Sequence, residues 1–367
     1  MSYITSIGTA NPQHRFSQHT IANFMVRAMN LNVEEARKLR VLYRATGIDT
    51  RYSVLDDYGR RNGYTFFSDN ILLAPFPSTK RRMELFKKHS LELSLASITQ
   101  CLEKIASLKK TEITHLIVVS CTGMYAPGLD IDLVKALELN SSINRTCINF
   151  MGCYAAFNAA RLADTFCAND QNAKVLVVCT ELCTIHFQKE NTEDNLLANA
   201  LFADGSAALL VETQPRKGIN LKPITFHCDL ATEGEHDMAW TIGDWGFEMK
   251  LSTYVPEVIR LGIKKLTQTL LEQMAKDLSG VSYFAIHPGG KKILEVIEQE
   301  LNISKDSNQH AYEILKRYGN MSSPTVVFVL GEIWKRLTAE DQNKTVLSFA
   351  FGPGLTLESM LLQVECH

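Results

Sequence analysis

Cys153 occupies a place in the sequence where a thiol gains nucleophilic character. It follows Gly152 directly, after the apolar run TCINF (146–150), and it opens the alanine-rich segment 153–167, whose apolar residues have helical spacing. A thiol in the first turn of a helix faces the positive end of the helix dipole and unpaired backbone N–H groups, which lower its pKa. We therefore predict a nucleophilic cysteine here, with the alternative that Cys153 is simply a small buried side chain.

Two polar residues further along the chain have types that complement such a thiol. His287 follows the apolar run YFAI and begins the turn HPGG (287–290), where bare glycine backbone leaves room for a ligand. Asn320 lies in the polar turn YGNMSS (318–323), just before an apolar segment with helical spacing. Taken singly, the histidine can be bonded to a loop and the asparagine can be a helix cap.

Cys153, His287 and Asn320 together indicate acyl transfer through a thioester. An imidazole can pair with the sulfur, while histidine and asparagine N–H groups can stabilise the negative charge that develops on a carbonyl oxygen. The sequence offers no obvious third carboxylate, which a hydrolase often uses to orient its histidine. A site that decarboxylates a malonyl group instead gains from neutral donors and from the exclusion of water.

The elements that must position these residues follow an alternating pattern. Short apolar runs alternate with longer segments of helical spacing, which is typical of a layered α/β protein. The runs are rich in Val, Ile and Phe and alternate little, so we expect strands covered on both faces. The expected strands are 115–121, 146–150, 174–180, 207–212, 283–287 and 345–351, and the helices expected beside the site are 153–167 and 324–337.

The polar stretch TQPRKGINLKP (213–223) is the clearest internal boundary, since it has two prolines, a glycine and no apolar periodicity. It divides the chain into a half that carries the cysteine, 1–214, and a half that carries the histidine and the asparagine, 215–367. Three strand-and-turn segments of the first half are echoed in the same order in the second. We therefore expect an internal duplication, which places Cys153 and Asn320 at equivalent helix starts.

The composition narrows the possible partners. Of 367 residues, 38 are Lys or Arg and 40 are Asp or Glu, so the net charge of −2 supplies no basic field for nucleic acid. Nine cysteines are scattered without a CxxC pair or zinc-type spacing, which disfavours a disulfide framework and a metal site. The first residues lack a secretory pattern, and no apolar stretch reaches the roughly 18 residues of a membrane span. We expect a cytoplasmic protein with small-molecule substrates and without nucleic-acid, membrane or metal partners.

Five segments resemble those of one enzyme family. MGCYAAF around Cys153, AIHPGGKKILEVIEQEL around His287 and YGNMSS around Asn320 are similar to the nucleophile, histidine and asparagine segments of type III polyketide synthases. AFGPGLTLE resembles the GFGPG signature of that family, with Ala350 in place of its first glycine, and ALFADGSAAL resembles ALFGDGAAA. Over nearly its whole length, the chain thus resembles a bacterial-like member of this chalcone and stilbene synthase group, within the thiolase-like condensing enzymes.

The resemblance implies an α/β protein with a thiolase-like, layered αβαβα fold made of two related halves, and a homodimer. It implies that coenzyme A thioesters, namely malonyl-CoA and a starter acyl-CoA, are the substrates, and that no metal or redox cofactor takes part. The active site would lie below a narrow tunnel for the pantetheine arm. Its catalytic residues would be Cys153, His287 and Asn320.

The resemblance also assigns residues to the substrate cavity and to coenzyme A. Phe202 and Met249 match two phenylalanines that gate the tunnel in plant enzymes, with Phe247 as the neighbouring possibility for the second. Ala126 matches a methionine that crosses the dimer into the partner's cavity, and two further positions match cavity threonines. The full set of expected substrate-binding residues is Phe202, Met249, Cys121, His186, Ala126 and Phe351, and the expected coenzyme A contacts are Lys38, Arg40, Arg44 and Gly289.

The resulting functional hypothesis is an iterated decarboxylative Claisen condensation. Malonyl-CoA loses carbon dioxide, its carbanion attacks the acyl group on Cys153, and repeated extension gives a chain that closes to a pyrone or a phenolic ring. The apolar wall expected from Met249, Ala126 and Cys121 favours a fatty acyl-CoA starter. The alternatives are a single-extension condensing enzyme of the ketoacyl synthase III type, a cysteine-dependent acyl-CoA thioesterase and a non-catalytic binding subunit.

Overall fold

The computed structural model describes residues 1–105, 107–235, 237–252, 255–273 and 277–367. Its strands are β1 (Tyr3–Ala10), β2 (His14–Ser17), β3 (Thr50–Ser53), β4 (His115–Ser120), β5 (Asn144–Asn149), β6 (Lys174–Leu182), β7 (Asp204–Glu212), β8 (Ile219–Leu230), β9 (Met238–Gly243), β10 (Gly246–Leu251), β11 (Tyr283–Ile286), β12 (Thr345–Gly352) and β13 (Thr356–Cys366). Its α-helices are α1 (Gln18–Ala28), α2 (Val33–Ala45), α3 (Thr79–Leu102), α4 (Leu129–Leu137), α5 (Ala155–Asn169), α6 (Glu193–Leu201), α7 (Val255–Glu272), α8 (Lys291–Leu301), α9 (Gln309–Tyr318) and α10 (Pro324–Trp334).

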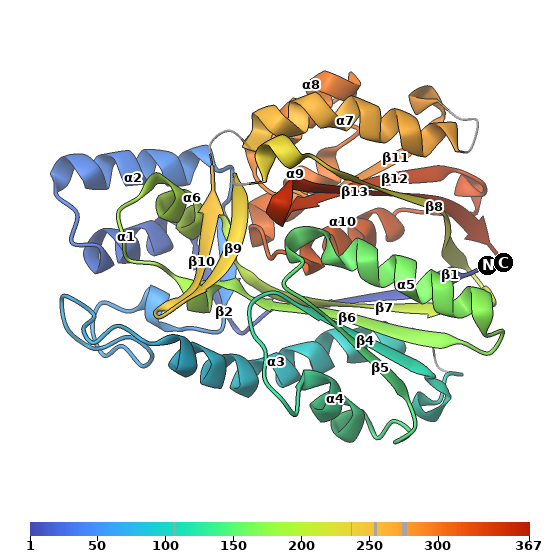
Figure 1. Cartoon of the computed structure of the whole chain (residues 1–367), viewed down its shortest axis with the longest axis horizontal. Helices are drawn as coiled ribbons and strands as arrows, with labels where there is room; N and C mark the ends of the chain where they lie inside the picture. The colour runs from blue at the N-terminus through green and yellow to red at the C-terminus, as the bar shows by residue number, and fades with distance from the viewer. Residues whose placement is uncertain (106, 236, 253–254, 274–276) are drawn as a thin grey trace.

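Helices and strands alternate in layers through the molecule (Figure 1). Helix α3 packs on β1, β6 and β7, whereas α7 packs on β8 and β13 at the opposite side. Between these strand groups lie α5 and α10: α5 contacts β6 and β13, and α10 contacts β7 and β11. The order is therefore helix, strand, helix, strand, helix, which confirms the expected αβαβα class.

One pairing pattern occurs twice in the nine-stranded sheet, whose order is β11-β12-β13-β8-β1-β7-β6-β4-β5. A parallel pair, β4–β6 or β11–β12, is followed by two antiparallel neighbours, which are β7 and β1 in the first half and β13 and β8 in the second. The two halves meet at the pair Ile4 and Leu221. This repeat of strand order and direction agrees with a chain made of two related halves.

The six strands expected from apolar runs are present as β4, β5, β6, β7, β11 and β12. Every residue of β4 and β12 is buried, as expected for strands covered on both faces. Strand β5 differs from that expectation, because its side chains alternate between exposed and half-buried. Strand β5 forms an edge of the nine-stranded sheet and pairs with β4 alone among the described strands, and the packed layers leave the side chains of this edge strand partly open to solvent.

Helix α10 shows why the centre of the molecule is so apolar. Residues 324–330 are all buried in succession, and helix α5 buries five alanines. A helix that is apolar on every side is stable only where protein surrounds it. The two helices between the strand layers meet that condition, and both begin beside the site described below.

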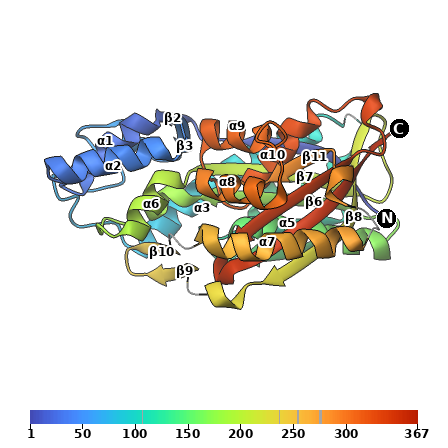
Figure 2. The ribbon, with the colours of Figure 1, turned by 90° about the horizontal axis from the view of Figure 1, so that it is seen from above.

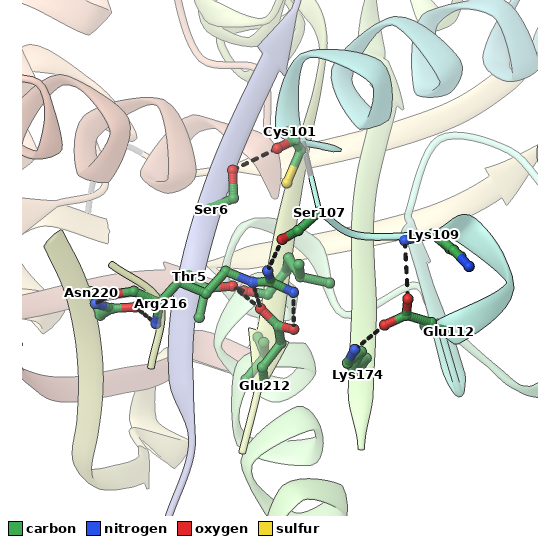
Figure 3. Close-up of polar contacts among 12 residues, drawn as sticks. Thr5, Ser6, Cys101, Ser107, Lys109, Glu112, Lys174, Glu212, Arg216 and Asn220 are labelled. Carbon is green, nitrogen blue, oxygen red and sulfur yellow. Dashed lines mark hydrogen bonds and ion pairs between the residues drawn. The ribbon is translucent and has the colours of Figure 1, made fainter. Parts of the chain in front are cut away.

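Residues 213–218 of the polar stretch form a hydrogen-bonded connection between β7 and β8, and residues 219–223 already belong to β8 (Figure 3). Arg216 makes two charged hydrogen bonds to Glu212, and the same carboxylate accepts the hydroxyl of Thr5 at 2.6 Å. The side chain of Asn220 accepts from the backbone N–H of Arg216 at 2.9 Å and donates to its carbonyl at 2.7 Å. The division into 1–214 and 215–367 falls inside this connection and stays a prediction, since one sheet runs through both halves.

One end of the molecule gathers elements that lie outside the layers. Helices α1 and α2 pack together, and α6 packs on α2 and on β10 (Figure 2). Both termini lie at the other end. Within the described ranges, the helices do not reach the length and apolar character that crossing a bilayer requires.

Candidate active site

Cys153 sits on a tight turn between β5 and α5. Gly152 has φ +75°, and a Cβ at this position would lie 2.4 Å from Cδ of Pro353, so both the conformation and the space demand glycine. Cys153 follows in a short 3₁₀ turn, Gly152–Tyr154, that leads directly into α5. The turn that carries Cys153 therefore packs against the GPG turn at 352–354.

His287 directly follows β11 and continues its pairing with β12, because its backbone N–H donates to the carbonyl of Phe349 at 2.8 Å. The chain then reverses, and the N–H of Gly289 donates to the His287 carbonyl at 2.9 Å. The side chain is 1% exposed. Neither ring nitrogen has a hydrogen-bond partner among the described residues, so both are available to a substrate.

Asn320 is held by its backbone and by its amide. Its N–H donates to the carbonyl of Leu201 at 3.0 Å, and its carbonyl accepts from Ala203 at 2.8 Å. The side-chain Oδ1 accepts from the N–H of Ser322 at 2.8 Å, while Nδ2 donates to the carbonyl of Gly289 at 3.2 Å. This network fixes the orientation of the amide and leaves the second N–H of Nδ2 for a ligand.

The structure brings Cys153, His287 and Asn320 to one buried cavity of about 30 Å³. The thiol of Cys153 faces Oδ1 of Asn320 at 4.0 Å, a long contact. The three residues come from the turn before α5, from the end of β11 and from the turn before α10, which are elements of both halves. The cavity is lined by Cys121, Gly152, Cys153, Phe202, Met238, Trp240, Met249, Leu251, His287, Gly289, Ile293, Asn320, Ser322, Phe351 and Pro353.

The electrostatics of the cavity favour neutral groups. Burial raises the pKa of Cys153 to about 12, although its hydrogen bond to Ser322 acts in the other direction. Burial also lowers the pKa of His287 to about 3. The sequence-based expectation of a lowered thiol pKa is therefore wrong for the resting protein, because desolvation outweighs the helix N-terminus. At neutral pH the site holds a thiol and a neutral imidazole.

A buried carboxyl group lies next to this cavity, contrary to the impression that the sequence offers none. Glu181 on β6 accepts the backbone N–H of Cys121 at 2.9 Å and the hydroxyls of Thr122 and Ser323 at 2.7 and 2.6 Å. Burial raises the pKa of Glu181. The missed signal was a single acidic residue within the apolar run KVLVVCTEL.

Phe202, Trp240 and Met249 separate the catalytic cavity from a second chamber of about 40 Å³, since all three line both spaces. The sequence predicted the first and the last of these, but not Trp240, whose indole N–H donates to the carbonyl of Cys121. Of the two alternatives for the second gate, Met249 lines the catalytic cavity and Phe247 lines only the chamber.

His186 also lines the second chamber and not the catalytic cavity. Its Nδ1 accepts the N–H of Phe247 at 2.9 Å, its Nε2–H donates to the carbonyl of Thr122 at 2.7 Å, and its ring stacks on Phe247. Burial lowers the pKa of His186 to about 3. His186 is therefore a neutral side chain that packs against the β9–β10 hairpin.

The remaining expected residues divide by position. Cys121 and Phe351 line the catalytic cavity, and the thiol of Cys121 contacts the Ser322 hydroxyl at 3.3 Å. Ala126 is exposed and is not part of this cavity wall. Its place in a partner's cavity stays a prediction.

The predicted coenzyme A contacts are only partly near the cavity. Lys38, Arg40 and Arg44 lie on α2 and line none of the cavities described here. Gly289 lines both the catalytic cavity and a neighbouring groove of about 270 Å³ between α2, α6 and the start of α8. Lys291 and Lys292, which sequence reasoning missed, border this groove.

The αβαβα layers and a Cys, His and Asn site drawn from both halves define a class of protein, the thiolase-like condensing enzymes. In the described part of the chain, no group of three or more His, Cys, Asp or Glu side chains is placed to hold a metal ion.

Comparison with known proteins narrows that class. Residues 1–215 match the N-terminal domain of chalcone and stilbene synthases, and residues 227–365 match their C-terminal domain. The chain therefore belongs to the chalcone and stilbene synthase family, and it is a type III polyketide synthase, an acyltransferase.

The relatives come from several kinds of organism. The chain is 29% identical to "Alpha-pyrone synthesis polyketide synthase-like Pks18" of Mycobacterium tuberculosis, over 99% of this chain and 91% of that protein. It is 30% identical to "Probable polyketide synthase 1" of Dictyostelium discoideum, of whose length it spans 11%. Among solved structures, PKS-I of the brown alga Ectocarpus siliculosus superposes with a TM-score of 0.92 at 29% identity, covering 99% of this chain and 98% of that one. The type III domain of the Dictyostelium hybrid synthase "Steely1" has a TM-score of 0.90 at 28% identity, with 99% of both chains covered.

Proposed function

We propose that this enzyme loads a starter acyl group on Cys153 and extends it by decarboxylative condensation with malonyl-CoA. One observation carries the proposal. A thiol, an imidazole with both nitrogens unpaired among the described residues and an amide with a spare N–H converge in one buried cavity of about 30 Å³. These groups match, one for one, the nucleophile, the base and the oxyanion donors that such a reaction needs.

In the loading step, His287 takes the proton of the Cys153 thiol as the sulfur attacks the carbonyl carbon of a starter acyl-CoA. The tetrahedral intermediate collapses, the new thioester forms on Cys153, and the coenzyme A sulfur leaves with the proton returned by His287. The low basicity of buried imidazole favours this return, because an imidazolium ion is unstable in a dry cavity. The loading step thus ends with a neutral imidazole at His287 and an uncharged thioester at Cys153.

In the extension step, the thioester oxygen of malonyl-CoA accepts hydrogen bonds from neutral His287 and from Nδ2 of Asn320. Carbon dioxide leaves, and the electron pair of the broken C–C bond becomes an enolate held by these two donors. The enolate carbon attacks the acyl carbon on Cys153, and the cysteine sulfur departs and takes up a proton from solvent. The extended chain is now a thioester of coenzyme A, and it returns to Cys153 by the loading step, which releases coenzyme A, before the next malonyl-CoA enters. Each cycle adds two carbons and uses only proton and electron-pair movements, so the proposed chemistry calls for no metal or redox cofactor.

The groove bordered by Lys291 and Lys292 is the proposed route for coenzyme A. It shares Leu251, Gly289 and Ile293 with the catalytic cavity, so a pantetheine arm in the groove points at Cys153. The side chains of Lys291 and Lys292 are 44% and 74% exposed, and each ammonium group lies within 4 Å of the Glu295 carboxylate, at 3.6 and 3.9 Å. We propose that these two ammonium groups meet phosphates of coenzyme A. The basic residues Lys38, Arg40 and Arg44 on α2 are proposed to act at longer range.

For the starter, we propose an aliphatic acyl group, and for the product a pyrone or a phenolic ring. The catalytic cavity is small and lined largely by apolar side chains. A longer chain gains room when Met249 and Trp240 turn aside and open the second chamber. The relative named for alpha-pyrone synthesis supports a pyrone in particular. We also propose that the enzyme is a homodimer and acts in the cytoplasm.

The test is incubation with malonyl-CoA and a panel of aliphatic and aromatic acyl-CoAs, with products read by mass spectrometry. The proposal predicts products that contain two or more malonyl-derived two-carbon units. A single diketide would favour the ketoacyl synthase III alternative, free starter acid alone would favour a thioesterase, and no turnover of any thioester would favour a binding subunit. Cys153→Ala serves as the control for non-enzymatic hydrolysis.

A further inference from the structure

Arg51 is a buried cation at the edge of the site, with no part in the reaction steps above. It lies on β3 and is 3% exposed. Its Nε donates to Oε1 of Gln18 at 2.9 Å, its Nη1 donates to the carbonyl of Phe202, and its Nη2 has no partner among the described residues. Burial lowers its pKa. A buried charge is costly, so its retention calls for a reason.

The first contact of Arg51 ties down the segment on which Asn320 rests. The Phe202 carbonyl that Arg51 binds belongs to the chain between Leu201 and Ala203, and these two residues form both backbone hydrogen bonds of Asn320. Gln18 reinforces the same segment, because its Nε2 donates to the carbonyl of Ala200 at 2.7 Å. The guanidinium and its amide partner thus fix residues 200–203 from one side.

The second contact of Arg51 lies on the other flank of Asn320. Gly319 has φ +72°, and a Cβ added there would lie 2.9 Å from both Cγ and Cδ of Arg51. The alkyl stem of the arginine therefore packs directly on the Gly319 backbone. A left-handed φ and this close approach both require glycine at position 319.

We propose that Arg51 is a positioning residue for Asn320. It holds the carbonyl of Phe202 on one side and the backbone of Gly319 on the other, so that the amide of Asn320 points at the substrate oxygen. The proposal rests on the proposed function, since it gives Asn320 the role of an oxyanion donor. It accounts for a buried cation that lines the second chamber and not the cavity of Cys153. Asp204 attracts this cation from a distance, but Arg51 forms no ion pair with a described carboxylate.

The test separates the two half-reactions. Arg51→Lys keeps the charge but cannot span both contacts, so we expect kcat for malonyl-CoA decarboxylation to fall roughly 10- to 100-fold, with KM little changed. Acylation of Cys153 by a starter acyl-CoA, which does not need Asn320 in the same way, should stay within about twofold. Gly319→Ala disturbs the packing of the Arg51 stem on residue 319. We therefore expect this variant, too, to lower the rate of decarboxylation relative to the rate of loading.

Arg82→Lys is the matched control. Arg82 is also fully buried and also has an unpartnered Nη2, but it donates to the carbonyls of Pro77 and Ile185, away from Asn320. We expect this variant to lose stability without a change in the ratio of decarboxylation to loading. If Arg51→Lys and Gly319→Ala lower both rates equally, or leave both unchanged, Arg51 is no positioning residue.

Asn320→Ala distinguishes failure of this inference from failure of the proposed function. If Asn320→Ala loses decarboxylation while Arg51→Lys keeps it, only the role of Arg51 is overturned. If Asn320→Ala itself decarboxylates malonyl-CoA normally, the oxyanion role of Asn320 fails, and the inference fails with it. Thermal melts of each variant show which protein remains folded at the assay temperature.

Discussion

Replacement of His287 by alanine tests how a thiol with a raised pKa is activated. With a pKa of about 12, only about 10⁻⁵ of Cys153 is thiolate at pH 7. The wild-type enzyme does not depend on this small thiolate fraction if His287 accepts the thiol proton during the attack on the starter thioester. His287→Ala must instead rely on the small population of thiolate already present.

The magnitudes follow from the two pKa values. Because the pKa of His287 is about 3, the imidazole is neutral and ready to accept a proton throughout the range from pH 5.5 to pH 9.5. We therefore expect the wild-type loading rate to be nearly independent of pH there. In His287→Ala the rate should rise about tenfold per pH unit, because the thiolate fraction does so below its pKa. At pH 7 the loss should be on the order of 100- to 10,000-fold, the usual contribution of a general base.

The assay is single-turnover acylation of the enzyme by a starter acyl-CoA, quenched with acid and read by intact-protein mass spectrometry. Asn320→Ala is the control, and we expect its loading rate to be as flat with pH as that of the wild type. A wild-type rate that climbs tenfold per pH unit would show that Cys153 reacts from free thiolate without help from His287. A flat profile for His287→Ala would refute the reasoning equally.

Three further changes follow from the cavity, the groove and the nucleophile turn. Trp240→Ala should join the catalytic cavity to the second chamber and lengthen the accepted starter, at a cost of about 3 kcal/mol in the free energy of unfolding measured with urea; an unchanged starter range would contradict this. Replacement of Lys291 and Lys292 by glutamate should raise KM for malonyl-CoA roughly 5- to 20-fold with kcat preserved, because the phosphates of coenzyme A would then meet like charges. A fall in kcat with KM unchanged would contradict a role of the groove in binding coenzyme A. Gly152→Ala should slow loading and lower stability by more than about 1 kcal/mol, since the new Cβ meets Pro353 at a left-handed φ; normal loading would argue against the packing role of that turn.

Much of the fold was predictable because its inner strands are continuous apolar runs. The strands β4 and β12 are buried on both faces, so their sequences carry a strong local signal. The hairpin β9–β10 and the long strands β8 and β13 were not predicted as strands. Strand β8 mixes buried, half-buried and exposed residues because it changes surroundings along its length, and this hides the apolar periodicity.

Local motifs were enough to single out Cys153, His287 and Asn320, which the structure brings to one cavity, whereas the electrostatics of these residues were not predictable. The turns around Cys153 and His287 are encoded by adjacent glycines, which the sequence shows directly. The pKa of the thiol depends instead on how completely distant elements exclude water, and this outweighs the local helix terminus. Trp240 and Glu181 escaped notice for the same reason, since only the packing of separate strands brings them to the site.

The most direct test of the central claim is to find where a starter acyl group becomes attached. Trypsin cleaves after Arg145 and Arg161 and releases the peptide 146–161, which contains both Cys153 and the exposed Cys147 as an internal control. After brief exposure to an acyl-CoA, fragmentation should place the acyl mass on Cys153, and later addition of malonyl-CoA should remove it as an extended product. An acyl group found on Cys147 or outside this peptide, or one that malonyl-CoA leaves in place, would contradict the account.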